Sequence, residues 1–253
     1  MSTPRFELTP TRRFADRASD YALFRPSYPK AAIDAALAGL ATDQGLVAAD
    51  VGAGTGISSR LLADRGLRVF AIEPNAAMRE SAEPHPRVTF VDGTAEATGL
   101  GAASVDLVVC AQAFHWFKPE EALSEFRRIV KPYGRLVFLV NERDNEDGPM
   151  RAYNAAIEAA ADLELSEGMP ASIDDALAGA GLAATPARFS HTQALSRDGL
   201  IGRASSASYV PKDGLRYEAL LGDLNALWTA HRDEGGLVTL GYRTFVWVVE
   251  ADG

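Results

Sequence analysis

A glycine-rich turn at residues 50–56 constrains the fold of this chain more than any other feature of the sequence. The turn reads Asp-Val-Gly-Ala-Gly-Thr-Gly, closes the apolar run 46–51 and precedes a helical stretch that contains Leu61 and Leu62. Glycine permits positive φ angles and a close approach of the backbone to a ligand. A strand that passes through such a turn into a helix is typical of a parallel α/β sheet, where a nucleotide-like ligand lies at the carboxyl end of the strand.

Short β-rich runs alternate with longer helical ones between residues 50 and 141. This alternation is typical of βαβ units and of a parallel sheet. The content of Val, Leu, Ile and Phe suits strands that are buried on both faces. The predicted strands are residues 46–51, 68–72, 88–91, 105–110 and 135–140.

The clearest helix is predicted at residues 120–130, where apolar side chains recur at three- and four-residue spacings on one face. Pro119 suits the first position of this helix. The run 131–134, which reads Lys-Pro-Tyr-Gly, is expected to end the helix and to turn the chain into the next strand. A further helix is predicted at residues 31–40, before the first strand.

The chain after residue 141 has a different pattern. An acidic, glycine-rich run at 142–148 is predicted as a solvated loop, and an Ala-rich helix is predicted at 152–165. Two later segments, 188–194 and 242–250, have the composition of strands. With no room for a helix after it, we expect the last strand to join the edge of the sheet as an antiparallel hairpin or insertion. A helical stretch is also expected around residues 217–231.

Composition bounds the number of domains. The 253 residues are 47% hydrophobic and 23% charged, which is average for folded chains and predicts a packed core. This length favours one large domain with a smaller cap over two independent cores. We therefore predict a single domain over residues 1–253. Its core is expected at about 31–141 with strands 188–194 and 242–250, and its cap is expected from residues 10–30, 142–170 and 195–236.

Charge and cysteine content exclude several classes of function. The net charge of −9 argues against a nucleic-acid binder. A single cysteine, Cys110, leaves no internal disulfide or multi-cysteine metal site, and the scattered histidines show no metal-ligand spacing. No apolar run approaches the roughly 18 residues that span a bilayer. We expect a soluble, cytoplasmic protein without a metal, a nucleic-acid partner or a membrane partner; the sequence leaves its oligomeric state open.

An acidic residue at the end of the second predicted strand gives the glycine turn its specificity. Glu73 follows Gly52 by 21 positions, where a carboxylate can accept hydrogen bonds from ribose hydroxyls. A dinucleotide fingerprint would need glycine at the position of Ile57. The third glycine stands one place earlier, at Gly56, which suits an adenosyl group that bears an amino acid better than a pyrophosphate.

The turn at 50–56 resembles motif I of the Rossmann-like S-adenosylmethionine-dependent methyltransferases. Four more segments agree with that family in order and spacing: Glu-Pro-Asn at 73–75 with Met78, Asp-Gly-Thr-Ala-Glu at 92–96, the run 112–117 and the run 131–136. Thr94 stands where the wider family often has Asp, and Tyr133 stands where it usually has Gly.

A narrower resemblance, to the trans-aconitate methyltransferase-like branch that acts on small molecules, rests on both ends of the chain. The segments concerned are Phe14, Tyr21, the run Arg-Pro-Ser-Tyr-Pro at 25–29, His-Trp-Phe at 115–117, residues 202–209 and the last strand. The resemblance implies an α/β fold with a mostly parallel, Rossmann-like, seven-stranded sheet, an antiparallel last strand and a helical cap.

The family resemblance also implies S-adenosylmethionine as cofactor. Arg25 is expected to pair with the carboxylate of the cofactor, and Tyr21 to lie near its sulfonium or near the acceptor. The expected cofactor-binding residues are Tyr21, Arg25, Asp50, Gly52, Ala53, Gly54, Gly56, Glu73, Pro74, Met78, Thr94, Ala95, Glu96 and Gln112.

Transfer of a methyl group from a sulfonium requires collinear donor and acceptor and exclusion of water more than a reactive side chain. The expected substrate-binding residues are Tyr28, His115 and Trp116, and the catalytic candidates are His115 and Tyr21. The pKa of a histidine, about 6.5, suits a general base, yet a carboxylate acceptor is already ionised at pH 7 and needs none. His115 is therefore open to two roles, as a base or as part of the pocket wall.

The prediction for function is S-adenosylmethionine-dependent methylation of a small molecule, with a carboxylate oxygen as the favoured acceptor. Methylation at carbon or nitrogen and a non-catalytic module that binds the cofactor are the alternatives. Ile57 disfavours a nicotinamide oxidoreductase.

Overall fold

A computed structural model describes residues 18–40, 45–161, 172–182, 184–207 and 209–251 of the chain. It contains a seven-stranded sheet in the order β3-β2-β1-β4-β5-β7-β6. Neighbouring strands among β1 to β5 pair in parallel, and β7 pairs antiparallel to both β5 and β6. The strands are β1 (Val47–Val51), β2 (Arg68–Ile72), β3 (Val88–Val91), β4 (Val105–Ala111), β5 (Val130–Arg143), β6 (Ala187–Leu195) and β7 (Val238–Glu250). The predicted Rossmann-like sheet with an antiparallel last strand is confirmed. The expected place of that strand at the sheet edge is wrong, because β6 pairs with the outer side of β7 and leaves β7 between β5 and β6.

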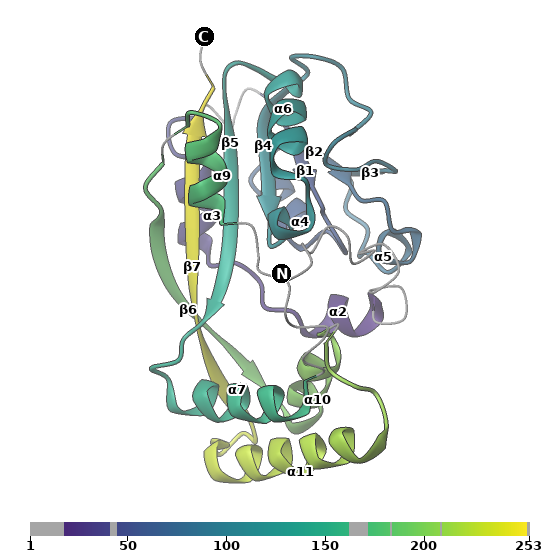
Figure 1. The fold of residues 1–253 in the computed structure, drawn as a ribbon, viewed down its shortest axis with the longest axis vertical. Helices are drawn as coiled ribbons and strands as arrows, with labels where there is room; N and C mark the ends of the chain where they lie inside the picture. The colour runs from purple at the N-terminus through teal and green to yellow at the C-terminus, as the bar shows by residue number, and fades with distance from the viewer. Residues whose placement is uncertain (1–17, 41–44, 162–171, 183, 208, 252–253) are drawn as a thin grey trace.

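Helices cover both faces of the sheet (Figure 1). One face packs against α3 (Lys30–Leu37) and α4 (Ile57–Ala63), with Ile33 and Leu62 fully buried among strand side chains. The other face packs against α6 (Pro119–Ile129) and α9 (Ile173–Gly179). Burial on two faces explains why the first strands have almost continuous apolar sequences. A short helix, α5 (Ala76–Glu80), follows β2.

Three helices form a separate layer beyond the carboxyl ends of the parallel strands (Figure 1). We call α7 (Gly148–Ala160), α10 (Arg197–Ser205) and α11 (Gly214–His231) the end layer. Their apolar side chains form a cluster that includes the first residues of β7, Val238 and Leu240. The strands β5, β6 and β7 extend toward these helices and connect the end layer to the sheet.

Several predicted boundaries differ from the structure. Strand β5 continues to Arg143 rather than ending at residue 140, because its last residues pair with residues 242–244 in the middle of β7. The expected turn at 131–134 is an irregularity inside β5, where Tyr133 has a φ of 62°. The acidic run 142–148 is not only a solvated loop, since Asp147 caps α7 by accepting a hydrogen bond from the backbone N–H of Met150 at 3.1 Å. Helix α7 therefore begins at Gly148, and residues 162–165 of the predicted helix lie outside the described residues.

The N-terminal helix α2 (Ala18–Phe24) bridges the sheet and the end layer. The ring of Phe24 fills the space above Gly202 of α10, where an added Cβ would lie 2.2 Å from the ring. The amide of Gln193 on β6 donates a hydrogen bond to the Phe24 carbonyl at 3.0 Å. These contacts fix the position of Tyr21 and Arg25, the residue that follows the helix.

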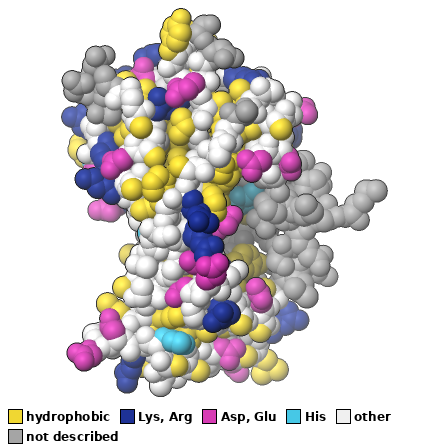
Figure 2. Space-filling model, turned by 90° about the vertical axis from the view of Figure 1, so that its left-hand side faces the viewer, with side chains coloured by type: hydrophobic (Ala, Val, Ile, Leu, Met, Phe, Trp, Pro, Cys, Tyr) yellow, Lys and Arg dark blue, Asp and Glu magenta, His cyan; other side chains and the backbone are white. Residues whose placement is uncertain are grey.

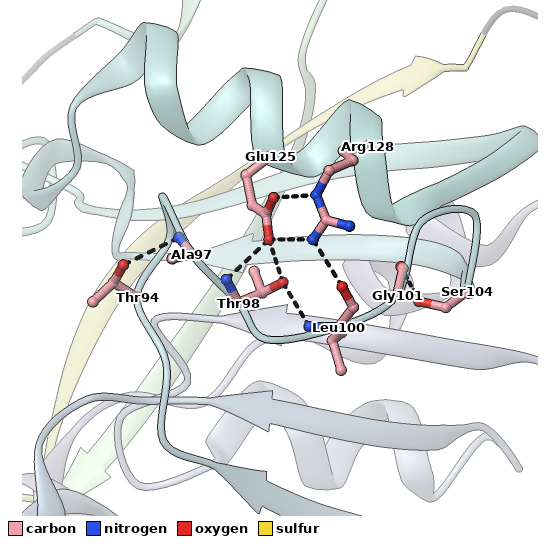
Figure 3. A network of polar contacts seen from close by, with 8 residues as sticks. All are labelled: Thr94, Ala97, Thr98, Leu100, Gly101, Ser104, Glu125 and Arg128. Atoms are coloured by element: carbon pink, nitrogen blue, oxygen red, sulfur yellow. Dashed lines mark hydrogen bonds and ion pairs between the residues drawn. The ribbon is translucent and has the colours of Figure 1, made fainter.

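A buried carboxylate on α6 holds the loop between β3 and β4 (Figure 3). Glu125 accepts hydrogen bonds from the hydroxyl and the backbone N–H of Thr98, at 2.6 and 2.9 Å. The Arg128 guanidinium donates two hydrogen bonds to the same carboxylate and a third to the Leu100 carbonyl. The hydrogen bonds from Arg128 and Thr98 lower the pKa of Glu125 to about 2. The loop that begins at Thr94 is thereby attached to the helix.

We expect Glu125→Gln to destabilise the fold by about 1.5 to 3 kcal/mol at pH 7, because the buried hydrogen bonds to a charged group are lost. The folded-state pKa of Glu125 lies below its ordinary value of 4.5, so its contribution is complete above pH 4.5 and declines as the pH falls toward about 2. Urea unfolding of both proteins between pH 7 and pH 3 measures this difference.

The exposed Glu121 on the same helix provides the matched control, because its ion pair with Lys118 is solvated. Glu121→Gln should change the unfolding free energy by well under 1 kcal/mol. An equal loss in both variants, or a Glu125→Gln loss that is the same at pH 3 and pH 7, would contradict the role given to Glu125.

Candidate functional site

The loop that follows β1 adopts three left-handed backbone conformations. Gly52, Gly54 and Gly56 have φ angles of 73°, 58° and 75°, which L side chains rarely adopt. A Cβ on Gly52 would lie 2.5 Å from the Cβ of Ala113 and 2.8 Å from the ring of Phe117. The loop therefore requires glycine both for its backbone angles and for its packing against the segment that follows β4.

The carboxylate of Glu73 fixes the loop from the end of β2. One of its oxygens accepts a hydrogen bond from the backbone N–H of Gly54, and the other accepts one from the N–H of Asn75, both at 2.9 Å. Burial raises the pKa of Glu73, although the two N–H donors and Arg79 oppose the rise. A carboxylate has about four lone-pair sites, so two directions remain for hydroxyl groups of a ligand.

The structure places Asp50 below the loop. One carboxylate oxygen of Asp50 accepts hydrogen bonds from the hydroxyls of Ser58 and Ser59 at 2.7 and 2.5 Å. The other oxygen is buried without a partner among the described residues, and burial raises the pKa of this carboxyl. Two cavities border this loop, and neither Asp50 nor Gly56 lines them. Both residues instead support the conformation of the loop, Asp50 through its hydrogen bonds and Gly56 through its left-handed φ.

A first cavity of about 340 Å³, the outer cavity, opens over the glycine loop. Glu73, Pro74 and Met78 line one side of it, and Thr94, Ala95 and Glu96 line another. The hydroxyl of Thr94 accepts a hydrogen bond from the N–H of Ala97 at 3.2 Å, so this side chain has a role in its own loop. Glu96 accepts a hydrogen bond from the N–H of Lys118, which connects that loop to the start of α6.

A second cavity of about 270 Å³, the inner cavity, lies between the sheet and the end layer. The described residues that line it include Arg25, Tyr28, Ala53, His115, Asn141, Arg143, Arg203, Tyr209 and Tyr242. Five residues line both cavities and form a shared wall: Tyr21, Gly52, Ala111, Gln112 and Trp116. The two cavities are thus neighbours, and a ligand in one would lie next to a ligand in the other.

Three arginines give the inner cavity its charge. The Arg25 guanidinium lies 4.6 Å from the centre of the Tyr21 ring and donates a hydrogen bond to the Ser206 carbonyl at 3.1 Å. Its Nε is buried without a partner among the described residues. Burial and the positive charge of Arg203 lower the pKa of Arg25, and a guanidinium nevertheless stays charged at neutral pH.

The other two arginines are held by phenol groups. Arg143 donates to the Tyr209 hydroxyl at 2.8 Å, and Arg203 donates to the Tyr242 hydroxyl at 3.3 Å. Burial lowers the pKa of Arg203, but Tyr242 and other tyrosines raise it by more. Burial raises the pKa of Tyr209, while the arginines outweigh it and leave this pKa below its ordinary value. No Asp or Glu occurs among the described residues that line the inner cavity.

The remaining predicted site residues lie at or near the junction of the cavities. His115 and Trp116 belong to the short helix η3 (Phe114–Trp116) after β4, and their rings lie 5.1 Å apart. Gln112 has a φ of 54° and donates from its side chain to the Asn141 carbonyl at 2.8 Å. Tyr28 lines the inner cavity and is buried, which raises its pKa.

The sequence interpretation did not name Arg143, Arg203, Tyr209 or Tyr242 as site residues. Arg143 lies beyond the predicted end of its strand, and the other three come from segments far away in the sequence. The sequence did contain one signal for Arg143. Ligands of α/β sheets bind at the carboxyl ends of the strands, and Arg143 follows a predicted strand at that end. The structure brings all four to one cavity with the N-terminal Arg25.

Comparisons with known proteins agree with this geometry. Residues 49–138 match the family model described as a methyltransferase domain. An uncharacterised methyltransferase of Mycobacterium tuberculosis is 39% identical over 139 residues, which cover 54% of this chain and 56% of that protein. An uncharacterised methyltransferase of Schizosaccharomyces pombe is 35% identical over 136 residues, covering 53% of this chain and 54% of that protein. The matched part is thus little more than half the length of these curated relatives.

Solved structures share the fold over a larger part of the chain. A candidate type II methyltransferase from Anaeromyxobacter dehalogenans is 23% identical with a TM-score of 0.59, covering 90% of this chain and 98% of that one. A candidate methyltransferase of an antibiotic biosynthesis pathway from Anabaena variabilis is 25% identical with a TM-score of 0.52, covering 80% and 90%. Residues 49–138 thus resemble a methyltransferase domain, and the Rossmann-like fold of the chain is shared by solved methyltransferase structures. The resemblance in sequence implies S-adenosylmethionine as the cofactor of such a domain.

The residues of the outer cavity fit the adenosyl part of this cofactor. Glu73 has free lone pairs for ribose hydroxyls, and the backbone of Gly54 borders the cavity with no side chain in between. The unpaired Nε of Arg25 and the neighbouring inner cavity suit an anionic group beyond the adenosyl part. In the described part of the chain, no group of three or more His, Cys, Asp or Glu side chains could hold a metal ion.

We expect Gly54→Val to abolish binding of S-adenosylhomocysteine. The φ of 58° is unfavourable for valine, and a Cβ would lie 3.2 Å from the Met78 methyl group, at the wall of the outer cavity. Calorimetric titration measures the affinity. Gly222→Val, at an open position on α11, is the control and should leave it unchanged. Unaltered affinity in Gly54→Val would contradict the position given to the cofactor.

Glu73→Ala should weaken binding of the same ligand by about 1.5 to 3 kcal/mol, since hydrogen bonds to a charged group are lost. The loop also loses the acceptor for the Gly54 N–H, so the thermal unfolding midpoint should fall as well. Glu80→Ala, at the exposed end of α5, controls for the removal of a negative charge nearby. A loss of stability without a loss of affinity would show a purely structural role for Glu73.

Proposed function

We propose that this protein transfers a methyl group from S-adenosylmethionine to a small molecule, and that a carboxylate oxygen is the favoured acceptor. The shared wall between the two cavities is the observation that carries the proposal. It supports a cofactor in the outer cavity and an acceptor in the inner one, on the two sides of a wall whose described residues are Tyr21, Gly52, Ala111, Gln112 and Trp116.

The charge of the inner cavity supports an acidic acceptor. Arg25, Arg143 and Arg203 line it, and the described residues of its wall include no carboxylate. Arginine forms strong, charge-assisted hydrogen bonds with carboxylates. A neutral amine or an aliphatic carbon acceptor would leave these guanidiniums without a counter-charge, which is why methylation at nitrogen or carbon is the second choice.

When bound, S-adenosylmethionine supplies an electrophilic methyl group on its sulfonium. Glu73 would accept hydrogen bonds from the ribose hydroxyls, and Met78, Ala95 and Pro74 would enclose the adenosine. Arg25 lies beside Tyr21 of the shared wall, so its guanidinium would hold either the carboxylate of the cofactor or that of the acceptor near the junction. The Tyr21 ring lines both cavities and would lie near the sulfonium of the bound cofactor.

The carboxylate reaction needs no general base. With the cofactor held at the outer cavity, an acceptor oxygen at the shared wall would form the bond to the methyl carbon as the bond from sulfur to carbon broke, which would give a methyl ester and S-adenosylhomocysteine. No proton is transferred, because a carboxylate is ionised at pH 7. His115 then serves as part of the wall of the inner cavity and orients the acceptor together with Tyr28 and Trp116.

We also propose that the end layer, with α2, is the cap of a single methyltransferase domain. These helices contribute Arg203 and Tyr21 to the cavities, and the strands β5 and β7 contribute Arg143 and Tyr242. The cap would exclude water from the inner cavity, which strengthens charge interactions there.

No helix in the described part of the chain is long and apolar enough to cross a membrane. Acidic and basic side chains are interspersed on the face drawn in Figure 2, as on a solvated surface.

Calorimetry against S-adenosylmethionine, S-adenosylhomocysteine and NAD tests the cofactor. We expect binding of both adenosyl ligands and no binding of NAD, because the dinucleotide fingerprint is interrupted by Ile57. Transfer of a radiolabelled methyl group to a panel of small acids, phenols and amines then tests the reaction. Acids should give a base-labile product, since a methyl ester hydrolyses in alkali.

Two outcomes would change the proposal. Binding without methyl transfer to any member of the panel would favour the non-catalytic module. Transfer to amines in preference to acids would overturn the carboxylate acceptor while leaving the methyltransferase activity intact.

A further inference from the structure

The segment that follows the N-terminal helix α2 is poorly suited to pair with a strand. Residues 24–28, which we call the linking segment, read Phe-Arg-Pro-Ser-Tyr, and a second proline follows at position 29. Proline has no backbone N–H, so two of the donors that a sheet ladder needs are missing from this stretch. The carbonyl groups of the linking segment remain available as acceptors, and side chains of the sheet supply the donors.

Two of these side chains converge on one carbonyl group. The Asn141 amide on β5 and the His191 ring on β6 both donate a hydrogen bond to the Ser27 carbonyl, each at 3.0 Å. A carbonyl oxygen has two lone pairs, so this acceptor is fully used. Ser27 stands between Arg25 and Tyr28, and both of these line the inner cavity. The two hydrogen bonds therefore fix the middle of the segment that forms one side of that cavity.

Thr244 on β7 sets the orientation of the Asn141 amide. A carbonyl group only accepts, so Asn141 must present its amino group to Ser27 and turn its amide oxygen away. That oxygen accepts a hydrogen bond from the Thr244 hydroxyl at 2.6 Å. Thr244 is fully buried opposite Asn141, and its hydroxyl oxygen also lies 3.5 Å from Nδ1 of His191. Thr244 thus contacts both residues that hold the Ser27 carbonyl.

His191 donates from one defined ring nitrogen. Burial lowers the pKa of His191, although hydrogen bonds with the backbone of Ser27 and of Tyr242 oppose this change. The ring is therefore neutral at pH 7 and has a single N–H group. The Ser27 carbonyl requires that this group is at Nε2.

Asn141 also contacts the other side of the shared wall. Its carbonyl accepts a hydrogen bond from the Gln112 side chain at 2.8 Å. Gln112 has a φ of 54°, and such a left-handed conformation of a side-chain-bearing residue persists only where its surroundings hold it. On the opposite side, the N–H of Arg25 donates to the Tyr21 carbonyl at 3.2 Å, which attaches Tyr21 to the linking segment. One polar network therefore connects Gln112 with the segment next to Tyr21.

We infer that Thr244 and His191 are positioning residues of the methyl transfer, which hold Tyr21 and Gln112 at fixed places in the shared wall. This inference rests on the proposed function. Neither Thr244 nor His191 is among the described residues that line the two cavities, so both act through Asn141 and the linking segment. Methyl transfer requires a collinear donor and acceptor, so a displaced wall reduces the rate more than it reduces binding.

Thr244→Val tests the inference, because it removes the hydroxyl and keeps the size of the side chain. We expect kcat for the panel acid that the wild-type protein methylates fastest to fall about 10-fold or more, since a misplacement of about 1 Å can cost about 100-fold in rate. The KM of that acid and the affinity for S-adenosylhomocysteine should stay within about threefold of wild type. Thr244→Ser retains the hydroxyl and should restore most of kcat. Thr239→Val, at an exposed position of the same strand, is the matched control and should leave kcat unchanged.

Hydrogen–deuterium exchange measures the attachment of the linking segment directly and needs no turnover. We expect the backbone amides of residues 21–28 to exchange about 10-fold faster in Thr244→Val and in His191→Leu than in the wild-type protein, whereas those of α11 keep the wild-type rate. His191→Gln retains an N–H donor for Ser27 and should keep the slow exchange. His191 is only partly buried, so its two variants decide the question if Thr244→Val does not fold.

Failure of the inference is distinct from failure of the proposed function. Unchanged kcat in Thr244→Val, or equal losses of kcat in Thr244→Val and Thr244→Ser, would overturn the positioning role while methyl transfer by the wild-type protein stands. Faster exchange along the whole chain, rather than at residues 21–28, would show a purely structural role. Absence of S-adenosylhomocysteine binding or of methyl transfer in the wild-type protein would overturn the proposed function, and the positioning role with it.

Discussion

The left-handed turn after β1 is the constraint on which the rest of the site depends. Gly52 must lie against Ala113 and Phe117 with no space for a Cβ, so the segment after β4 is positioned by the backbone of the first loop. Glu73 then fixes the same loop from the second strand through the N–H of Gly54. The segments after β1, β2 and β4 therefore contact one another without a ligand, which preorganises the outer cavity.

The long strands β5, β6 and β7 explain how a second cavity arises beside the first. They extend toward the end layer and connect its helices to the sheet. An ordinary parallel sheet would end at a common edge, and its crevice would be open to solvent. Here Arg143 and Tyr242 stand in register on adjacent strands, and α10 adds Arg203 from the other side. The inner cavity is therefore a consequence of strand length, and α2 extends across it from the N-terminal side.

The sheet and the glycine loop could be predicted from the sequence because their determinants are local. Strands buried on both faces have continuous apolar runs, and the glycines of a left-handed turn can be read directly from the sequence. The bounds of β2 and β3 agree with the prediction for that reason. Tyr133 shows the limit of such reasoning, since it takes a left-handed φ of 62° without being a glycine.

The inner cavity could not be predicted in the same way. The extension of β5 to Arg143 depends on pairing with a strand about a hundred positions later, and no local pattern encodes that pairing. Asp147 illustrates the same point, since its place in an acidic run predicted a solvated loop whereas it caps α7 and accepts a hydrogen bond from the N–H of Gly241. The structural roles of Arg143 and Asp147 both depend on contacts with β7, which is distant in the sequence.

The charge of the inner cavity has a consequence for stability as well as for recognition. Among the described residues of the cavity wall, three guanidiniums stand without a carboxylate and repel one another, and Arg203 contributes to the lowered pKa of Arg25. A fold normally removes such repulsion with an acid or with an apolar substitution, because either costs less than an unpaired buried charge. The described part of the cluster instead includes phenol groups that accept hydrogen bonds from the guanidiniums, such as that of Tyr242. The described contacts hold the arginines in place while their charge stays available to a ligand. If the proposed acidic acceptor binds there, it would supply the counter-charge and stabilise the folded protein on binding.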